Sequence, residues 1–143
     1  MSDPALDSVV SVYFALEIDS ADLGVFSSCE GLGIELQITQ REDGGGGSVV
    51  HLLPGRFKYT NVRVTRPIGP DTAKTMAWLQ RMVNGVSPSN ARLSALSPDG
   101  NVVYSWSLLG VLPARWTGPS FNASSLSPAT ETLELAYSSI LFE

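Results

Sequence analysis

Hydrophobic and polar residues alternate strictly along residues 34–41. Ile34, Leu36 and Ile38 point to one side of an extended chain. The residues between them point to the other side, and these are Glu35, Gln37, Thr39 and Arg41. Alternation with a period of two over this length predicts a β-strand with one apolar face and one polar face.

Similar alternation recurs along most of the chain and predicts about seven or eight strands. The strands are expected within residues 10–18, 23–29, 34–41, 49–53, 57–66, 91–97, 101–109 and 130–142. Pro98, Asp99 and Gly100 form a turn sequence between two of these strands. Pro113 marks residues 110–116 as an edge strand or an irregular segment, because proline has no amide hydrogen to donate. We therefore expect a mainly β fold, a barrel or sandwich of mostly antiparallel strands.

One α-helix is predicted over residues 71–84, flanking the strands. Asp71 suits the N-cap position, and Gly85 suits the position just after the last turn. The apolar residues that recur at helical spacing form one stripe: Met76, Leu79 and Val83, extended by Trp78 and Met82. We expect this stripe to face the core.

Residues 42–56 predict an extended glycine-rich loop. Four consecutive glycines lose too much entropy on ordering to hold a strand, and these are Gly44, Gly45, Gly46 and Gly47. Pro54 and Gly55 indicate a turn. Between the glycines and this turn lies an apolar group with no obvious use in a lone domain: Val49, Val50, Leu52 and Leu53. We expect the loop to leave the body of the subunit and to pack on a neighbouring subunit.

The length of 143 residues fits a single domain, 1–143, with residues 1–8 as a loose arm. Charged residues make up 16% of the chain, below a typical value of about 25%, which favours a surface partly covered by partner subunits. The net charge of -5 and the lack of a Lys/Arg run argue against tight binding of nucleic acid through its phosphates. No apolar run approaches the roughly 18 residues of a membrane span.

The N-terminal sequence lacks the basic and apolar regions of a secretory signal, so we expect none. Cys29 is the single cysteine and cannot form an internal disulfide, which suits a reducing cytoplasm.

Candidate catalytic residues are sparse. His51 is the single histidine and sits in a short apolar run, so a structural or interface role is favoured over that of a base. Cys29 and His51 are the only residues that could form a nucleophile–base pair, and nothing in their spacing supports one. No zinc, calcium or P-loop pattern is present. The sequence therefore predicts no enzyme, no metal and no cofactor, and favours a binding or structural protein.

A series of short motifs follows a fixed order along the chain. The motifs are Phe14–Ile18, Phe26, Cys29–Leu32, Ile34–Arg41, Glu42–Gly47, Leu53–Gly55, Asn61–Val64, Trp78, Asp99–Trp106, Leu112–Pro113 and Glu131–Tyr137. Their order and spacing resemble the tail tube protein family of T4-type contractile phages, which also supplies the inner tubes of phage-tail-like contractile injection systems. The resemblance covers the chain from about residue 9 to its end. The run of four glycines and the segment 65–67 depart from the family pattern.

The resemblance implies a structural subunit with a compact β barrel or sandwich and a flanking helix. Six copies would form a ring, and rings would stack into a hollow tube. The implied partners are the protein itself, the sheath, baseplate and tube-terminating proteins, and cargo or DNA that passes without tight binding. Glu35, Gln37, Thr39 and Arg41 would then give a mixed polar lining to the lumen. The subunit would be made in the cytoplasm of the producing bacterium and assembled into a phage-tail-like particle or a virion tail.

The leading interpretation is the inner tube of an injection system. One alternative is the tail tube of a contractile bacteriophage that conducts DNA. A further alternative from another class is a β-sandwich module that binds a carbohydrate or protein ligand through the glycine-rich loop.

Overall fold

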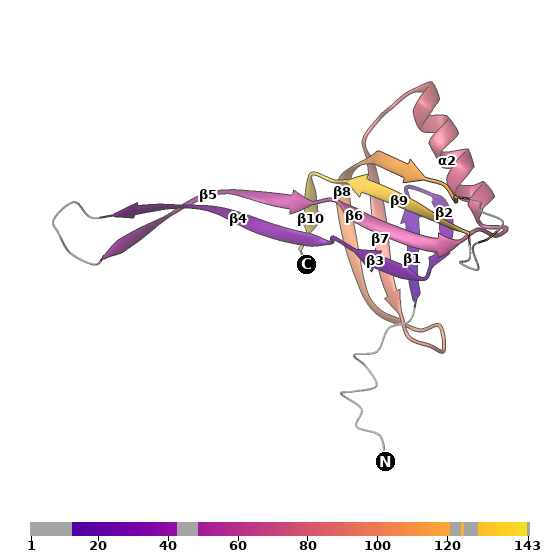
Figure 1. The fold of residues 1–143 in the computed structure, drawn as a ribbon, viewed down its shortest axis with the longest axis horizontal. Coiled ribbons are helices and arrows are strands. Elements are labelled where there is room, and N and C mark those ends of the chain that lie inside the picture. The colour runs from indigo at the N-terminus through magenta and orange to yellow at the C-terminus, as the bar shows by residue number, and fades with distance from the viewer. Residues whose placement is uncertain (1–12, 43–48, 121–123, 125–128, 143) are drawn as a thin grey trace, which may run out of the picture.

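The computed structural model describes residues 13–42, 49–120, 124 and 129–142. These residues form ten strands and one helix, α2 (Thr72–Asn84), and the strand pairs among them are antiparallel. Eight strands form a curled sheet, and the other two form a long hairpin that projects from the body on the side away from α2 (Figure 1). The predicted mainly β class with one flanking helix is confirmed, as a sandwich-like sheet and not a closed barrel.

The curled sheet has two halves that share one long strand. The first half has the order β2 (Ala21–Phe26), β1 (Tyr13–Ile18), β7 (Ser89–Leu96), β8 (Val102–Thr117) and β10 (Ser139–Leu141). The second half has the order β8, β9 (Thr130–Ala136), β6 (Val62–Pro67) and β3 (Ser28–Glu30). Gly110, at a φ of 67°, lies where β8 changes partners, and Ser138 would collide with any side chain there.

The two halves enclose one hydrophobic core. Its fully buried side chains come from both halves: Leu16, Ile18, Leu23, Phe26, Val62, Val64, Leu93, Leu108, Val111, Leu133 and Leu135. Arg66 on β6 and Glu131 on β9 are also buried, and the Arg66 guanidinium donates to the Asp71 carbonyl and the Thr75 hydroxyl at the start of α2. The polar cluster therefore ties the helix to the sheet.

Helix α2 starts one residue later than predicted and ends at the predicted residue, but it buries a different stripe. Thr75, Trp78 and Met82 are buried, and Leu79 packs against the core from its edge. The prediction that Met76, Leu79 and Val83 face the core is wrong for Met76 and Val83, which are 36% and 83% exposed. The helix is rotated so that its largest residue, Trp78, fills the core, because an aromatic ring contributes more buried apolar area than Val83.

Residues 42–56 differ from the predicted loop. β4 (Gly33–Glu42) continues to Glu42, and β5 (Val50–Thr60) runs without a turn through Pro54 and Gly55. Pro54 is tolerated because a two-stranded sheet has open outer edges, where a missing N–H breaks no inner ladder. Gly44–Gly47 lie outside the described residues.

The predicted closing strand over residues 130–142 is also interrupted. Tyr137 and Ser138 divide it into β9, which pairs with β6 and β8, and β10, which pairs with another part of β8. Pro113 lies within β8, where residues 112–117 pair with β9 alone among the described strands, and the register shifts at Pro113, so this part of β8 is both an edge and irregular.

Candidate assembly interface

The β4–β5 hairpin continues a ribbon that begins inside the body. β3 pairs with β6 in the sheet, and beyond the break at Gly31 and Leu32 the same two segments of the chain pair again as β4 and β5 (Figure 1). The antiparallel register is the same on both sides of this break. The sheet therefore fixes the inner end of the hairpin, while its outer end stands clear of the body.

A bulge in β5 keeps the two faces of the hairpin separate. Leu36 lies opposite Phe57, and Ile38 lies opposite Pro54, so Gly55 and the next residue together face a single residue of β4. Without the extra residue, Pro54 and Phe57 would point to opposite faces, because side chains alternate along a strand. The bulge therefore places both on the face of Leu36 and Ile38.

One face of the hairpin is polar, as the sequence predicts. Glu35, Gln37, Thr39 and Arg41 share this face by strand alternation. Across the ladder, Glu35 lies opposite Lys58, and Arg41 lies opposite His51. Glu35 and Lys58 carry opposite charges, and a pair of this kind in directly facing positions stabilises two paired strands by roughly 0.2–1 kcal/mol. Thr39 faces Leu53, so this residue of the predicted apolar group belongs to the polar face.

The other face of the hairpin is open to solvent, apolar near the body and mixed in polarity at its outer end. Its apolar members come from both strands: Ile34, Leu36, Ile38, Val50, Leu52, Pro54, Phe57 and Tyr59, while Gln40 and Glu42 share the face opposite Leu52 and Val50. The exposed fraction is 54% for Ile38, 61% for Leu52 and 63% for Phe57. An exposed apolar face of this kind marks a surface that binds another molecule, because burying it removes apolar area from water.

The root of the hairpin is held by Tyr137. Its hydroxyl donates to the carbonyl of Gly33 at 3.2 Å and accepts from the amide of Gly33 at 3.3 Å, and its ring lies 5.8 Å from that of Tyr59. Thr60 donates to the carbonyl of Gly31. Gly31 has a φ of 88°, a conformation that favours glycine. These contacts set the direction in which the hairpin leaves the sheet.

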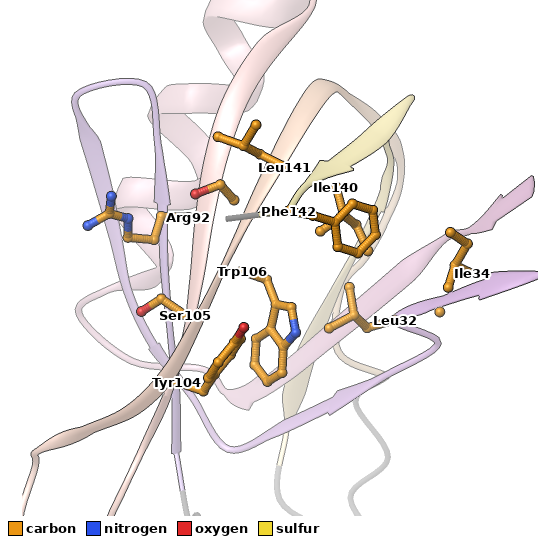
Figure 2. A pocket seen from close by; sticks show the side chains of 11 residues that line it. Leu32, Ile34, Arg92, Tyr104, Ser105, Trp106, Ile140, Leu141 and Phe142 are labelled. Carbon is orange, nitrogen blue, oxygen red and sulfur yellow. The ribbon is translucent and has the colours of Figure 1, made fainter. Parts of the chain in front are cut away.

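A groove of about 590 Å³ opens beside this root (Figure 2). Leu32, Trp106 and Ile140 form an apolar wall together with Tyr104, whose ring lies 5.1 Å from that of Trp106. Arg92, Ser105 and Ser107 also line the groove. Arg92 and Ser105 lie on the other side of β8 from Trp106 and Leu32 (Figure 2). The groove therefore extends around one edge of β8, with an apolar lining on one side of this strand and a polar lining on the other.

The structure separates the two residues that the sequence offers for nucleophilic chemistry. Cys29 lies in β3 inside the body, and His51 lies opposite Arg41 in the outer hairpin. Twelve residues of the ribbon separate Cys29 from Arg41 along the chain, which is roughly 40 Å at about 3.4 Å per residue. Burial, and to a lesser degree Glu30, raise the pKa of the Cys29 thiol to about 11, so its reactive thiolate is suppressed at neutral pH.

Sequence reasoning located the hairpin but missed the groove. Tyr104 and Trp106 of β8 and Ile140 of β10 line the groove, and Tyr137, in the break between β9 and β10, bonds to Gly33, so only the fold brings these residues together. The exposure of Tyr104 could not be read from its strand, because alternation assigns it to the same side as the buried Leu108.

Residues 10–140 match the model of the T4-like virus tail tube protein gp19 family. The chain belongs to this family of tail tube proteins. Its members are structural tube proteins and not enzymes. No curated protein sequence matches the chain.

Solved structures of tube proteins share the fold. The match to a chain of the sheath–tube complex of the extracellular contractile injection system PVC, in its extended state, has a TM-score of 0.76 at 20% identity, over 99% of this chain and 97% of that one. A chain of the anti-feeding prophage baseplate matches with a TM-score of 0.74 at 22% identity, over 99% and 96% of the two chains. Hcp1 from Salmonella typhimurium matches with a TM-score of 0.57 at 15% identity, over 92% and 85%. The tail tube fold thus spans nearly the whole chain.

Within the described part of the chain, α2 is too short and too polar to cross a bilayer.

Proposed function

We propose that the protein is the subunit of the inner tube of a phage-tail-like contractile injection system. In this proposal six copies form a ring, and the rings stack into a hollow tube through which cargo passes. Family membership and the fold shared with tube proteins support the tube role. The TM-scores of 0.76 and 0.74 with chains of the PVC injection system and the anti-feeding prophage support an injection system.

The observation that carries the proposal is the open apolar face of the β4–β5 hairpin. Ile38, Leu52 and Phe57 expose more than half of their surface in the single chain. Two-stranded hairpins that stand alone are marginally stable in water, and this one extends over ten residues of β4. Packing on a second subunit would bury the face and stabilise the hairpin. The apolar residues of the predicted inter-subunit group would then act chiefly through Val50 and Leu52.

A contact between the hairpin of one copy and the body of the next joins two different surface patches. Such heterologous contacts form closed rings when the rotation closes and open helical stacks when it does not. A tube of stacked rings needs both contacts within a ring and contacts between rings. The hairpin is long enough to make either kind of contact.

We propose that the polar face of the hairpin lines the lumen through Glu35, Gln37, Thr39 and Arg41. These side chains mix an acid, a base and two neutral groups, and Lys58 and His51 continue the mixture across the ladder. A lining without a dominant sign of charge holds neither a polyanion nor a polycation tightly, so cargo can slide.

The sheath, the baseplate and a tube-terminating protein are the proposed partners of the assembled tube. Structures with the same fold come from a sheath–tube complex, a baseplate and a tube-terminating cap. We further propose that the subunit is made in the cytoplasm of the producing bacterium before assembly.

A second candidate is the tail tube of a contractile phage that conducts DNA. The family model itself describes a virus tail tube protein, which favours this alternative. The genes beside that of this protein distinguish the two, because a phage requires capsid and terminase genes and an injection system does not.

The assembly proposal is tested by negative-stain microscopy of the purified protein at high concentration. We expect hollow rings or stacked tubes. Leu52→Asp should abolish them, because it places a charge on the apolar face. Leu53→Asp is the matched control, since the same change falls on the polar face and should leave assembly largely intact.

Circular dichroism should show that both variants keep the wild-type fold. A wild-type protein that stays monomeric would favour the β-sandwich binding module instead. Full-length tubes from Leu52→Asp would mean that the apolar face is not the contact.

A further inference from the structure

β2 has a strand neighbour on one edge only. Among the described strands it pairs with β1 alone. Its other edge faces β6, because the amide of Ser27, just past the end of β2, donates to the Thr65 carbonyl at 2.9 Å. The backbone groups of Leu23 and Val25 point to the same side as those of Ser27, since alternate residues of a strand share one edge. An edge of this kind readily pairs with a strand of another molecule.

The side chain of Arg66, the residue after Thr65, covers this edge of β2. One terminal nitrogen of its guanidinium donates to the carbonyl of Leu23 at 2.6 Å and to that of Val25 at 3.5 Å. The other donates to the Asp71 carbonyl at 2.8 Å and to the Thr75 hydroxyl at 2.6 Å, at the start of α2. The guanidinium therefore takes the place that the amides of a neighbouring strand would have.

We propose that Arg66 is an edge cap, which prevents β2 from pairing with β2 of a second copy. The cap is a property of the single chain, so the proposal does not depend on the tube function. Its consequence for any ordered assembly is that subunits join through other surfaces, without competition from this edge.

The surface beside the capped edge would favour association if the cap were absent. A hollow of about 340 Å³ adjoins the edge, and Arg66 forms part of its lining. Tyr13, Val25 and Ile68 also line this hollow, and each is at least 40% exposed. Exposed apolar side chains next to an unpaired backbone edge are the features that lead to edge-to-edge pairing.

Glu131 allows an arginine to serve as the cap in a buried position. A buried charge is costly without a counter-ion, and the Glu131 carboxylate lies 3.4 Å from the Arg66 Nε. Arginine also suits the position by its shape, because its planar fork of donors reaches β2 and α2 at the same time. The single ammonium of a lysine could serve only one of these two elements.

The test removes the cap together with its counter-ion. Arg66→Met with Glu131→Gln leaves no uncompensated buried charge, so we expect this uncapped variant to fold. At a concentration at which the wild type sediments as a monomer, at least about half of the uncapped variant should form dimers or larger species. Leu93→Ala is the matched control, because it lowers stability through a core cavity and leaves the cap contacts in place. It should stay monomeric.

A second change to the uncapped variant shows whether the new contact uses β2. Val25→Lys blocks the same edge by other means, since a charged side chain on an edge strand disfavours pairing. It should return the protein to monomers without recovering the urea midpoint. Val83→Lys places the same charge on the exposed face of α2 and should leave the association unchanged.

Cross-linking locates the contact directly. In a Cys29→Ser background, Val25→Cys should join two copies of the uncapped variant when a short bis-maleimide is added. The same cysteine in the capped chain should give no dimer under these conditions.

The outcomes decide the proposal whether or not the wild type forms tubes at higher concentration. An uncapped variant that folds and stays monomeric would overturn the edge cap. Association that Val83→Lys reverses as well as Val25→Lys would place the contact elsewhere, and would also overturn it. If circular dichroism shows that the double variant does not fold, Arg66→Lys takes its place. That variant keeps the charge beside Glu131 and should still associate more than the wild type, and a monomeric Arg66→Lys protein would overturn the proposal.

Discussion

Arg66 on β6 lies directly opposite Glu131 on β9, with the guanidinium Nε and the carboxylate Oε2 3.4 Å apart and both side chains buried. This contact is an ion pair without the directed geometry of a hydrogen bond. Other polar atoms of these two side chains do form hydrogen bonds: the Trp116 indole donates to Glu131 at 3.2 Å, and Arg66 donates to the carbonyl of Leu23 at 2.6 Å.

Glu131→Gln should destabilise the folded monomer by about 3–5 kcal/mol, because it leaves the buried Arg66 charge without its counter-ion. Urea unfolding followed by tryptophan fluorescence measures the loss. Glu30→Gln is the control, since Glu30 pairs with the half-exposed Arg63 at 3.7 Å and such surface pairs contribute about 0–1 kcal/mol. Equal losses of unfolding free energy from the two changes would mean that the buried pair stabilises the fold no more than the surface pair does.

The rotation of α2 predicts which of its residues matter for stability. Trp78 is 2% exposed, so Trp78→Ala should cost about 3–5 kcal/mol of unfolding free energy. Val83 is 83% exposed, so Val83→Ala should change it by no more than about 0.5 kcal/mol. The same urea experiment compares the two variants. A larger loss of unfolding free energy from Val83→Ala than from Trp78→Ala would mean that the stripe predicted from the sequence faces the core.

The helix shows where sequence patterns stop being informative. Helical spacing alone fits two neighbouring stripes, one through Met76 and Val83 and one through Trp78 and Met82. The choice depends on the shape of the cavity that both halves of the sheet leave open, which no local pattern contains. The bounds of α2 were predicted to within one residue, but the predicted caps were not: the Asp71 side chain makes no capping hydrogen bond, and Gly85 is extended instead of left-handed.

The hairpin, like the helix, was predicted from the sequence only in part. Alternation along residues 34–41 placed four polar side chains on one face, as β4 has them. The bulge at Gly55 was not visible, because a Pro-Gly pair more often ends a strand than bends one. The groove beside Tyr137 depends on three segments distant in sequence, so only the tertiary structure shows it.

Gly31 should be needed for the direction of the hairpin. Its φ of 88° disfavours any side chain, and an added Cβ would collide with the carbonyl oxygen of Asn61. Gly31→Ala should therefore cost about 1–3 kcal/mol and impair assembly, measured by urea unfolding and by sedimentation. Gly85→Ala should be nearly neutral, since Gly85 is extended and an added Cβ meets no atom within 4 Å. A neutral Gly31→Ala would show that the chain can leave the sheet by another path.

Cys29 should react slowly with alkylating reagents at neutral pH. Its pKa of about 11 leaves about one thousandth of the thiol ionised at pH 8, and the thiolate is the reactive form. The alkylation rate of the folded monomer should therefore keep rising by about tenfold per pH unit up to about pH 10. Mass spectrometry of quenched samples gives the rate. A plateau near pH 8.5 would mean that burial does not protect this thiol.

The slow reaction of Cys29 makes an added cysteine at Gln37 a usable probe of the lumen. Gln37 is exposed in the single chain and lies on the polar face between Glu35 and Thr39. If this face lines the tube, Gln37→Cys should react with a bulky maleimide in the monomer and be at least about tenfold slower in assembled tubes, because the reagent must enter from the tube ends. Val83→Cys on α2 should react at similar rates in both states, which controls for the general effect of assembly. Equal rates for Gln37→Cys in monomers and tubes would place the polar face outside the lumen, and the outward side of β7 and β8 around Arg92 would become the next surface to probe.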